Sequence, residues 1–233
     1  MKKYLNIAKE CIKQNKELIN KKLVIHNFGN VSLRIDKEHF VIKPSGAELT
    51  KLKPQDMPVV NIKSGKKVRG NLKPSTDTPT HLEIYRKFID INSIAHNHSN
   101  YATVWAQSSK SIPLIGTTHA DYWKNEVPIV EFLSSKDLKQ NYEKNTGKLI
   151  IKTLKELGIS PFEIPGILVA NHGVFSWGKD LKTAVKNAES IEYIANLAFN
   201  TLLIKPKISI IPKHISDLHH NRKHGESAYY GQS

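Results

Sequence analysis

At 233 residues, the chain is long enough for one domain with a sizeable hydrophobic core. Its formal net charge of +14 could attract nucleic acid or an anionic small substrate, but the lysines are scattered over the whole chain, which argues against a nucleic-acid-binding protein. The sequence contains no run of about 18 apolar residues, which a membrane helix would need, and its N-terminal segment regains charge too soon for a signal peptide. The single cysteine, Cys11, excludes an intramolecular disulfide. We therefore expect a cytoplasmic protein without a membrane partner.

The first part of the chain alternates between helical and strand-like patterns. Apolar residues at helical spacing predict a helix over residues 3–20, and short apolar runs predict strands at 40–42 and 59–62. Thr78 followed by Pro79 is typical of a helix start and predicts a helix that continues to Phe88. This order of elements indicates a mixed α/β domain.

The second part of the chain continues this alternation and ends in a polar segment. The predicted elements are a strand at 93–95, helices at 101–107 and 146–157, a strand at 166–170 and a long helix at 180–203. Beyond Pro212 the sequence is a polar, basic tail.

Three histidines stand at the ends of the two most strongly apolar strands. His96 and His98 are separated by one residue, so in an extended strand both imidazoles point to the same face. His172 follows the second strand, and Gly173 after it predicts a sharp turn. Each histidine could also be an ordinary polar residue at a strand end, but together they predict a site for zinc or a similar transition metal with positions open for substrate.

Several short motifs resemble the L-ribulose-5-phosphate 4-epimerase family within the class II aldolase superfamily. They are Phe28-Gly29-Asn30-Val31-Ser32, Lys43-Pro44-Ser45-Gly46, residues 73–81 (KPSTDTPTH), His96-Asn97-His98-Ser99, Gly116-Thr117-Thr118-His119-Ala120-Asp121, His172-Gly173, Arg222-Lys223-His224-Gly225 and Ala228-Tyr229-Tyr230-Gly231-Gln232. Asp77, the His-Ala-Asp run and the Tyr-Tyr-Gly-Gln tail are the features that resemble the epimerases rather than the related aldolases. Asn27-Phe28, Lys144-Asn145 and Asn171 depart from the usual residues beside these motifs.

The resemblance implies a fold, a cofactor and an assembly. The fold is α/β, a three-layer α/β/α single domain over residues 1–233 around a largely antiparallel central sheet. The cofactor is one Zn²⁺ per subunit, for which Co²⁺ or Mn²⁺ could substitute. The assembly is a homotetramer whose active sites lie between subunits, and the C-terminal tail, about residues 213–233, contributes to the neighbouring site.

The resemblance also assigns roles to individual residues. The metal shell would be Asp77, His96, His98 and His172, although Asp77 stands ahead of Thr78-Pro79 and could instead be a helix cap. The catalytic residues would be Asp121, Tyr230 and His219. The substrate-binding residues would be Asn30, Lys43, Ser45, Gly46, Ser75, Thr76, Thr117, Thr118 and Glu143.

The implied reaction interconverts L-ribulose 5-phosphate and D-xylulose 5-phosphate by retro-aldol cleavage and re-formation of the C3–C4 bond, as in arabinose or ascorbate catabolism. Inverting a carbinol carbon without an acidic C–H is hard by simple deprotonation, and retro-aldol cleavage offers another route. One alternative is a class II sugar-phosphate aldolase of the fuculose-phosphate type, in which the aldehyde is released. A more remote alternative, suggested by charge alone, is a basic nucleic-acid-binding module.

Overall fold

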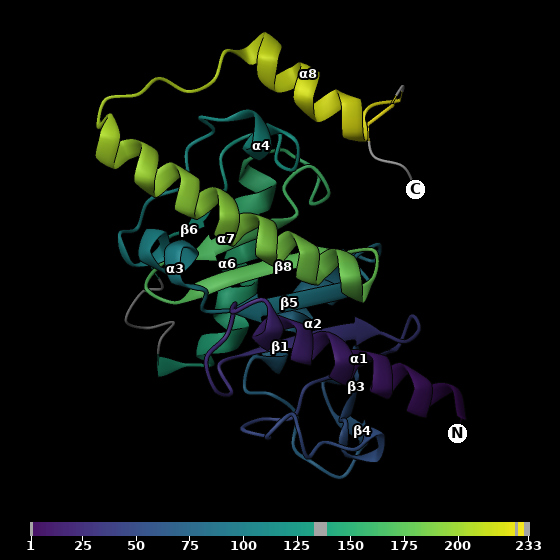
Figure 1. Ribbon diagram of the computed structural model, residues 1–233. Helices are drawn as coiled ribbons and strands as arrows, with labels where there is room; N and C mark the ends of the chain where they lie inside the picture. The colour runs from purple at the N-terminus through teal and green to yellow at the C-terminus, as the bar shows by residue number, and fades with distance from the viewer. Residues whose placement is uncertain (1, 133–138, 227, 231–233) are drawn as a thin grey trace.

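The computed structural model describes residues 2–132, 139–226 and 228–230, and its centre is one eight-stranded sheet (Figure 1). The strands are β1 (Gly29–Arg34), β2 (His39–Ile42), β3 (Val59–Asn61), β4 (Lys67–Arg69), β5 (Ser93–Asn97), β6 (Ile129–Val130), β7 (Gly166–Val169) and β8 (Gly173–Gly178). Their order in the sheet is β4-β3-β2-β1-β5-β8-β7-β6. Every neighbouring pair is antiparallel except β6 and β7, so the expected largely antiparallel sheet is confirmed.

Helices cover both faces of this sheet, which confirms the three-layer α/β/α arrangement. The helices are α1 (Lys2–Asn20), α2 (Thr78–Lys87), α3 (Asn100–Gln107), α4 (Thr117–Ala120), α6 (Tyr142–Glu156), α7 (Leu181–Ile204) and α8 (Lys213–His224). Figure 1 shows α1 and α7 in front of the sheet and α2 and α6 behind it. Because side chains alternate along a strand, Val41 packs in the same cluster as α1 and α7, whereas Phe40 packs with α2.

Most predicted elements are confirmed with small shifts at their ends. The helix predicted at 3–20 is α1, the helices at 78–88 and 101–107 are α2 and α3, and the helix at 180–203 is α7. The helix predicted at 146–157 begins earlier, at Tyr142, because a polar first turn precedes its apolar face. The strands predicted at 40–42, 59–62, 93–95 and 166–170 are β2, β3, β5 and β7.

Two elements show where apolar periodicity is insufficient. The polar, basic segment beyond Pro212, for which no helix was predicted, contains the helix α8 (Lys213–His224), in which only Ser216 and His220 are buried. A helix that buries polar residues gives no apolar stripe to detect. Strand β1 was not predicted for the same reason, since its buried side chains include Asn30 and Ser32.

None of the helices in the described ranges is long and apolar enough to cross a membrane.

Two buried histidines outside the metal-site candidates make the fold sensitive to acid. Burial lowers the pKa of His81 to about 3 and that of His119 to about 4, from an ordinary value of 6.5. Below pH 6.5 the unfolded chain therefore binds protons that the folded chain does not, so the free energy of unfolding of the metal-free protein should fall as the pH drops from 6.5 towards 4. Urea unfolding midpoints measured between about pH 7.5 and about pH 4.5 should show this decline.

A His119→Gln variant provides the control for this prediction. Its unfolding midpoint should depend less steeply on pH than that of the wild type, because one of the two depressed groups is gone. A wild-type midpoint that stays constant across the same range would contradict the prediction.

Candidate metal and substrate site

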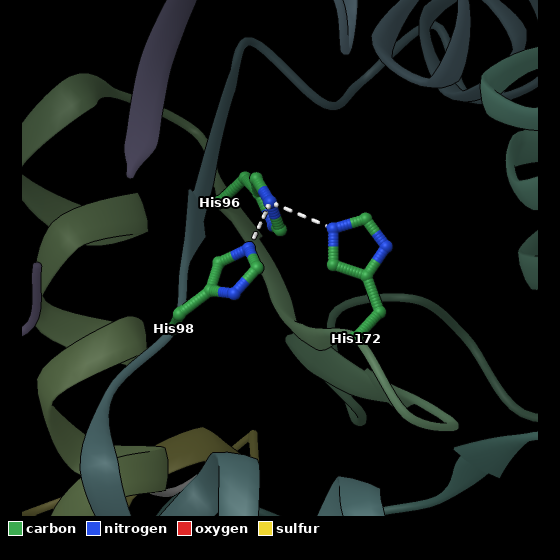
Figure 2. A group of neighbouring side chains, drawn as sticks. All are labelled: His96, His98 and His172. Atoms are coloured by element: carbon green, nitrogen blue, oxygen red, sulfur yellow. Dashed lines mark hydrogen bonds between the residues drawn. The ribbon is translucent and has the colours of Figure 1, made fainter. Parts of the chain in front are cut away.

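The structure brings the three predicted histidines into one cluster. Nε2 of His96 lies 3.1 Å from Nε2 of His98 and 3.2 Å from Nε2 of His172. One ring nitrogen from each of the three lies within 4.8 Å of the others. Figure 2 shows the three rings converging from two separate chain segments.

The pairing of β5 with β8 positions His96. Its ring stacks on Phe175 of β8, with ring centroids 4.2 Å apart and planes inclined by 16°. Its Nδ1 lies 2.8 Å from the carbonyl oxygen of Val174, and only a protonated Nδ1 can donate to a carbonyl. The Nε2 of His96 is therefore a bare lone pair that faces the other two rings.

His172 lies in the turn between β7 and β8, and the expectation about this turn needs correction. The residue in the left-handed region is Asn171, with φ of 57°, rather than Gly173. Asparagine tolerates this conformation better than most residues. Gly173 is needed for a different reason, because a Cβ there would lie 2.6 Å from the carbonyl oxygen of Asn97 in β5.

The protonation state of the cluster suits metal binding. Burial lowers the pKa values of His96 and His98, and burial together with nearby His96 lowers the pKa of His172 to about 4. At neutral pH the imidazoles are therefore uncharged and can offer nitrogen lone pairs.

Asp77 adds a carboxylate to the edge of the cluster. Its Oδ2 lies 4.0 Å from Nε2 of His96 and accepts hydrogen bonds from the amide of Asn30, at 2.7 Å, and from the hydroxyl of Ser75, at 3.3 Å. Burial alone would raise the pKa of Asp77, but the surrounding imidazoles and the Asn30 amide bring it below its ordinary value. Asp77 occupies the N-cap position of α2, yet its side chain makes no capping hydrogen bond, so the cap alternative explains little.

The donor set fits a divalent transition metal. Zinc–nitrogen bonds of about 2.0–2.1 Å place neighbouring nitrogens of a tetrahedral site about 3.3–3.4 Å apart. The two measured nitrogen separations, 3.1 and 3.2 Å, are close to this value. The cluster could therefore hold a metal through His96, His98 and His172, with Asp77 alongside.

A pocket of about 280 Å³ opens beside the cluster. It is lined by Asn27, Phe28, Gly29, Asn30, Lys43, Ser45, Gly46, Ser75, Thr76, Asp77, His96, His98, Tyr142, Glu143 and His172. This lining contains all four predicted metal-site residues and all the predicted substrate contacts except Thr117 and Thr118.

Two turns form the polar wall of this pocket and are joined by backbone hydrogen bonds. The amide of Ser45 donates to the carbonyl of Lys73, and the amide of Ser75 donates to the carbonyl of Lys43, both at 3.1 Å. These bonds hold the Ser45 and Ser75 side chains on one wall, where hydroxyl groups could contact an anionic substrate.

Lys43 is the cation of the same wall. Its Nζ donates to the carbonyl of Asn27, at 3.2 Å, and the residue is buried. Burial lowers the pKa of Lys43, and the charge of Asp77 opposes this effect. A buried ammonium beside a small polar pocket is suited to binding an anionic group.

The predicted catalytic residues form a second cluster, and none of them lines this pocket in the described part of the chain. Asp121, at the end of α4, accepts hydrogen bonds from His219 Nδ1, at 3.1 Å, and from Arg222 through both carboxylate oxygens, at 2.9 Å. The Arg222 guanidinium also lies 4.3 Å from the ring centre of Tyr230. Helix α8 therefore brings His219 and Arg222 to Asp121, and Tyr230, which follows this helix, lies against Arg222.

The electrostatics of this second cluster favour an ionised Asp121. Burial raises the pKa of its carboxyl, but the hydrogen bonds from Arg222 and His219 and the charge of Lys223 outweigh burial and lower it. Thr117 and Thr118 lie in α4 on the same side of the molecule, and Thr118 lines a separate cavity with Tyr122.

Four residues that line the metal pocket, Asn27, Phe28, Gly29 and Tyr142, were not among the predicted site residues. Asn27 donates to the carbonyl of Gly46, at 3.1 Å, and the exposed ring of Phe28 lies 6.3 Å from that of His98. The hydroxyl of Tyr142 lies 2.6 Å from Nδ1 of His172. Only the adjacency of Tyr142 to Glu143 could have drawn attention to it.

The family model for the class II aldolase and adducin N-terminal domain matches residues 9–199 of this chain.

Solved structures of similar shape include several aldolases. An L-fuculose 1-phosphate aldolase superposes with a TM-score of 0.76 at 24% identity, covering 93% of this chain and 95% of the other. YgbL from Escherichia coli, named as a candidate aldolase/epimerase/decarboxylase, has a TM-score of 0.71 at 24% identity, with 93% and 99% covered. L-fuculose-1-phosphate aldolase from Thermus thermophilus has a TM-score of 0.66 at 20% identity, with 88% and 98% covered. These likenesses concern the fold.

Proposed function

Because this chain belongs to the class II aldolase and adducin N-terminal domain family, we propose that it is a zinc-dependent, cytoplasmic L-ribulose-5-phosphate 4-epimerase. The observation that carries the proposal is the convergence of three uncharged histidines beside Asp77, in a pocket that is also lined by Lys43 and serine hydroxyls. This arrangement supports a small sugar phosphate as the substrate, bound with one end at the histidines and its phosphate at the polar wall.

The metal would supply one kind of chemistry. When bound by His96, His98 and His172, it would act as a Lewis acid towards the oxygens at C2 and C3 of the ketose and so favour cleavage of the C3–C4 bond. The residues of the chain have the remaining tasks of binding the phosphate, accepting a proton and returning one.

Phosphate binding falls to the turns that the backbone hydrogen bonds join. Ser45, Ser75 and Thr76 would offer hydroxyl groups, and Lys43 would offer a positive charge, so the phosphate end is held while the carbon skeleton separates. An aldehyde fragment that is held in the site can rotate and be attacked on its other face, whereas a released fragment leaves the site before the bond can re-form.

Proton transfer requires one group on each face of the reacting carbon. As the C3–C4 bond breaks, a base must remove the proton from the C4 hydroxyl, and when the bond re-forms on the other face, an acid must protonate the new C4 alkoxide. Asp121, which is held ionised by Arg222, is suited to accepting a proton, and the Tyr230 hydroxyl is suited to donating one. In the reverse direction the two roles exchange.

The separation of the two clusters supports a site shared between subunits. Asp121, His219 and Tyr230 lie together but outside the pocket of their own chain. We therefore place them in the pocket of a neighbouring subunit of a homotetramer. The presence of two candidate proton-transfer groups, Asp121 and Tyr230, supports the epimerase over the aldolase, because the epimerase must exchange a proton with the C4 oxygen on each face.

The purified protein loaded with Zn²⁺ tests this proposal. It should convert L-ribulose 5-phosphate to D-xylulose 5-phosphate without accumulating glycolaldehyde phosphate, as followed by chromatography of the reaction mixture. Persistent free aldehyde would instead support an aldolase. Cleavage of L-fuculose 1-phosphate that is faster than epimerisation of L-ribulose 5-phosphate would support the same conclusion, since structurally similar proteins are named as fuculose-phosphate aldolases.

A further inference from the structure

Two histidines of the metal cluster, His96 and His172, are held in different ways. His96 is fixed by the backbone carbonyl of Val174 and by stacking on Phe175. His172 lies in a turn, and its outer nitrogen Nδ1 contacts a side chain from another element, the hydroxyl of Tyr142, at 2.6 Å. The two rings are nearly parallel, inclined by 12° with centroids 5.8 Å apart.

We propose that Tyr142 is the positioning residue of this metal site, acting through His172. A histidine that binds a metal through Nε2 must carry its proton on Nδ1, and that proton needs an acceptor. The phenolic oxygen of Tyr142 can provide it. The hydrogen bond then favours the tautomer that leaves Nε2 of His172 free and holds the ring towards His96. This inference rests on the metal site of the proposed function.

The place of Tyr142 is itself fixed by the packing of two helices. Tyr142 begins α6, and the hydroxyl of Thr80 in α2 donates to the carbonyl of Glu143, at 2.7 Å. The helices approach so closely that a Cβ on Gly147 would lie 2.9 Å from the carbonyl oxygen of Thr80. Because Asp77 stands at the start of the same α2, packing of α2 against α6 places both Asp77 and the acceptor for His172 around one cluster.

A Tyr142→Phe variant isolates the hydroxyl, since it keeps the aromatic ring beside His172. Co²⁺ is the probe, because its visible absorption reports both occupancy and ligand geometry. Hydrogen-bond partners of metal ligands typically contribute about 10- to 100-fold to metal affinity, so the variant should bind Co²⁺ more weakly by that factor in competition with a chromophoric chelator. Its cobalt absorption bands should also shift in position or intensity, because His172 is no longer held in one orientation.

Tyr4→Phe is the matched control. The Tyr4 hydroxyl also makes a 2.6 Å hydrogen bond, but to the carbonyl oxygen of Met57, and it does not line the metal pocket. Tyr4→Phe should alter thermal stability at most and keep the wild-type cobalt affinity and spectrum.

The outcomes separate this inference from the proposed function. If Tyr142→Phe and wild type bind Co²⁺ equally well with the same spectrum, the positioning role is wrong while the metal site stands. If both tyrosine variants weaken cobalt binding equally, the effect is one of general stability and the role is again wrong. If the wild-type protein binds no Co²⁺, the metal site fails, and the proposed function and the role of Tyr142 fail with it.

Discussion

Replacing His98 with asparagine is expected to reduce epimerase activity by a factor of about 10³ or more, because stabilisation worth several kcal/mol at a metal centre is lost with a ligand. His98 offers its Nε2 to the cluster 3.1 Å from that of His96. Asparagine is similar in size but has no imidazole nitrogen at that distance. Activity should be followed by formation of D-xylulose 5-phosphate, and bound metal should be measured in the same preparation.

His39→Asn is the control for the His98 variant. His39 lies on β2, pairs with Asp36 and lines a cavity distant from the metal pocket. This variant should retain both activity and metal. A His98→Asn protein that keeps more than about a tenth of wild-type activity at normal metal content would contradict the assignment of His98 as a ligand, since loss of a ligand costs several kcal/mol.

Mixing two inactive variants is expected to restore activity if the active site is shared between subunits. Asp121→Asn alone should lose about 10²- to 10⁴-fold, the usual contribution of a general acid or base. In a tetramer assembled at random from equal amounts of Asp121→Asn and His98→Asn chains, about one quarter of the sites combine an intact metal cluster with an intact Asp121 from the neighbour. Co-expressed, differently tagged chains should therefore regain about a quarter of wild-type activity in the mixed assemblies.

The control mixes two variants of the same cluster. His96→Asn with His98→Asn should restore nothing, because every site then carries a damaged metal cluster whichever neighbour it has. Absence of recovery in the Asp121→Asn and His98→Asn mixture, in assemblies shown to contain both chains, would mean that Asp121 does not act in a neighbour's pocket.

Local pattern was sufficient for most of the fold. Helices such as α1 and α7 bury an apolar face, and β2, β3, β5 and β7 are short apolar runs, so side-chain periodicity reports them directly. Periodicity failed for β1 and α8, where the buried positions include polar residues such as Asn30, Ser32 and His220. Asn30 and Ser32 are buried because they meet hydrogen-bonding partners from distant segments, and such partners are invisible in a local window.

For the metal cluster, the sequence by itself determined the ligand types. The alternation of a strand put His96 and His98 on one side, and a second apolar run ended just before His172. Only the tertiary structure decided that these residues meet, because the contact depends on β5 pairing with β8. Likewise, the sequence leaves Asp77 as either a helix cap or a ligand, and only the tertiary structure shows that its side chain makes no capping bond and instead contacts Asn30 and Ser75 beside His96.

The contacts of Tyr142 and of Asp121 could not be read from any local sequence pattern. The sequence determined which side chains can bind a metal, carry a proton or contact a phosphate, since these capacities are properties of the residue types. The tertiary structure decided that Tyr142 reaches His172. It also decided that α8 brings Arg222 to Asp121 and that Tyr230 lies against Arg222, outside the metal pocket of its own chain. The physical reason is that such contacts join elements far apart in sequence, and helix packing and strand pairing set their distances.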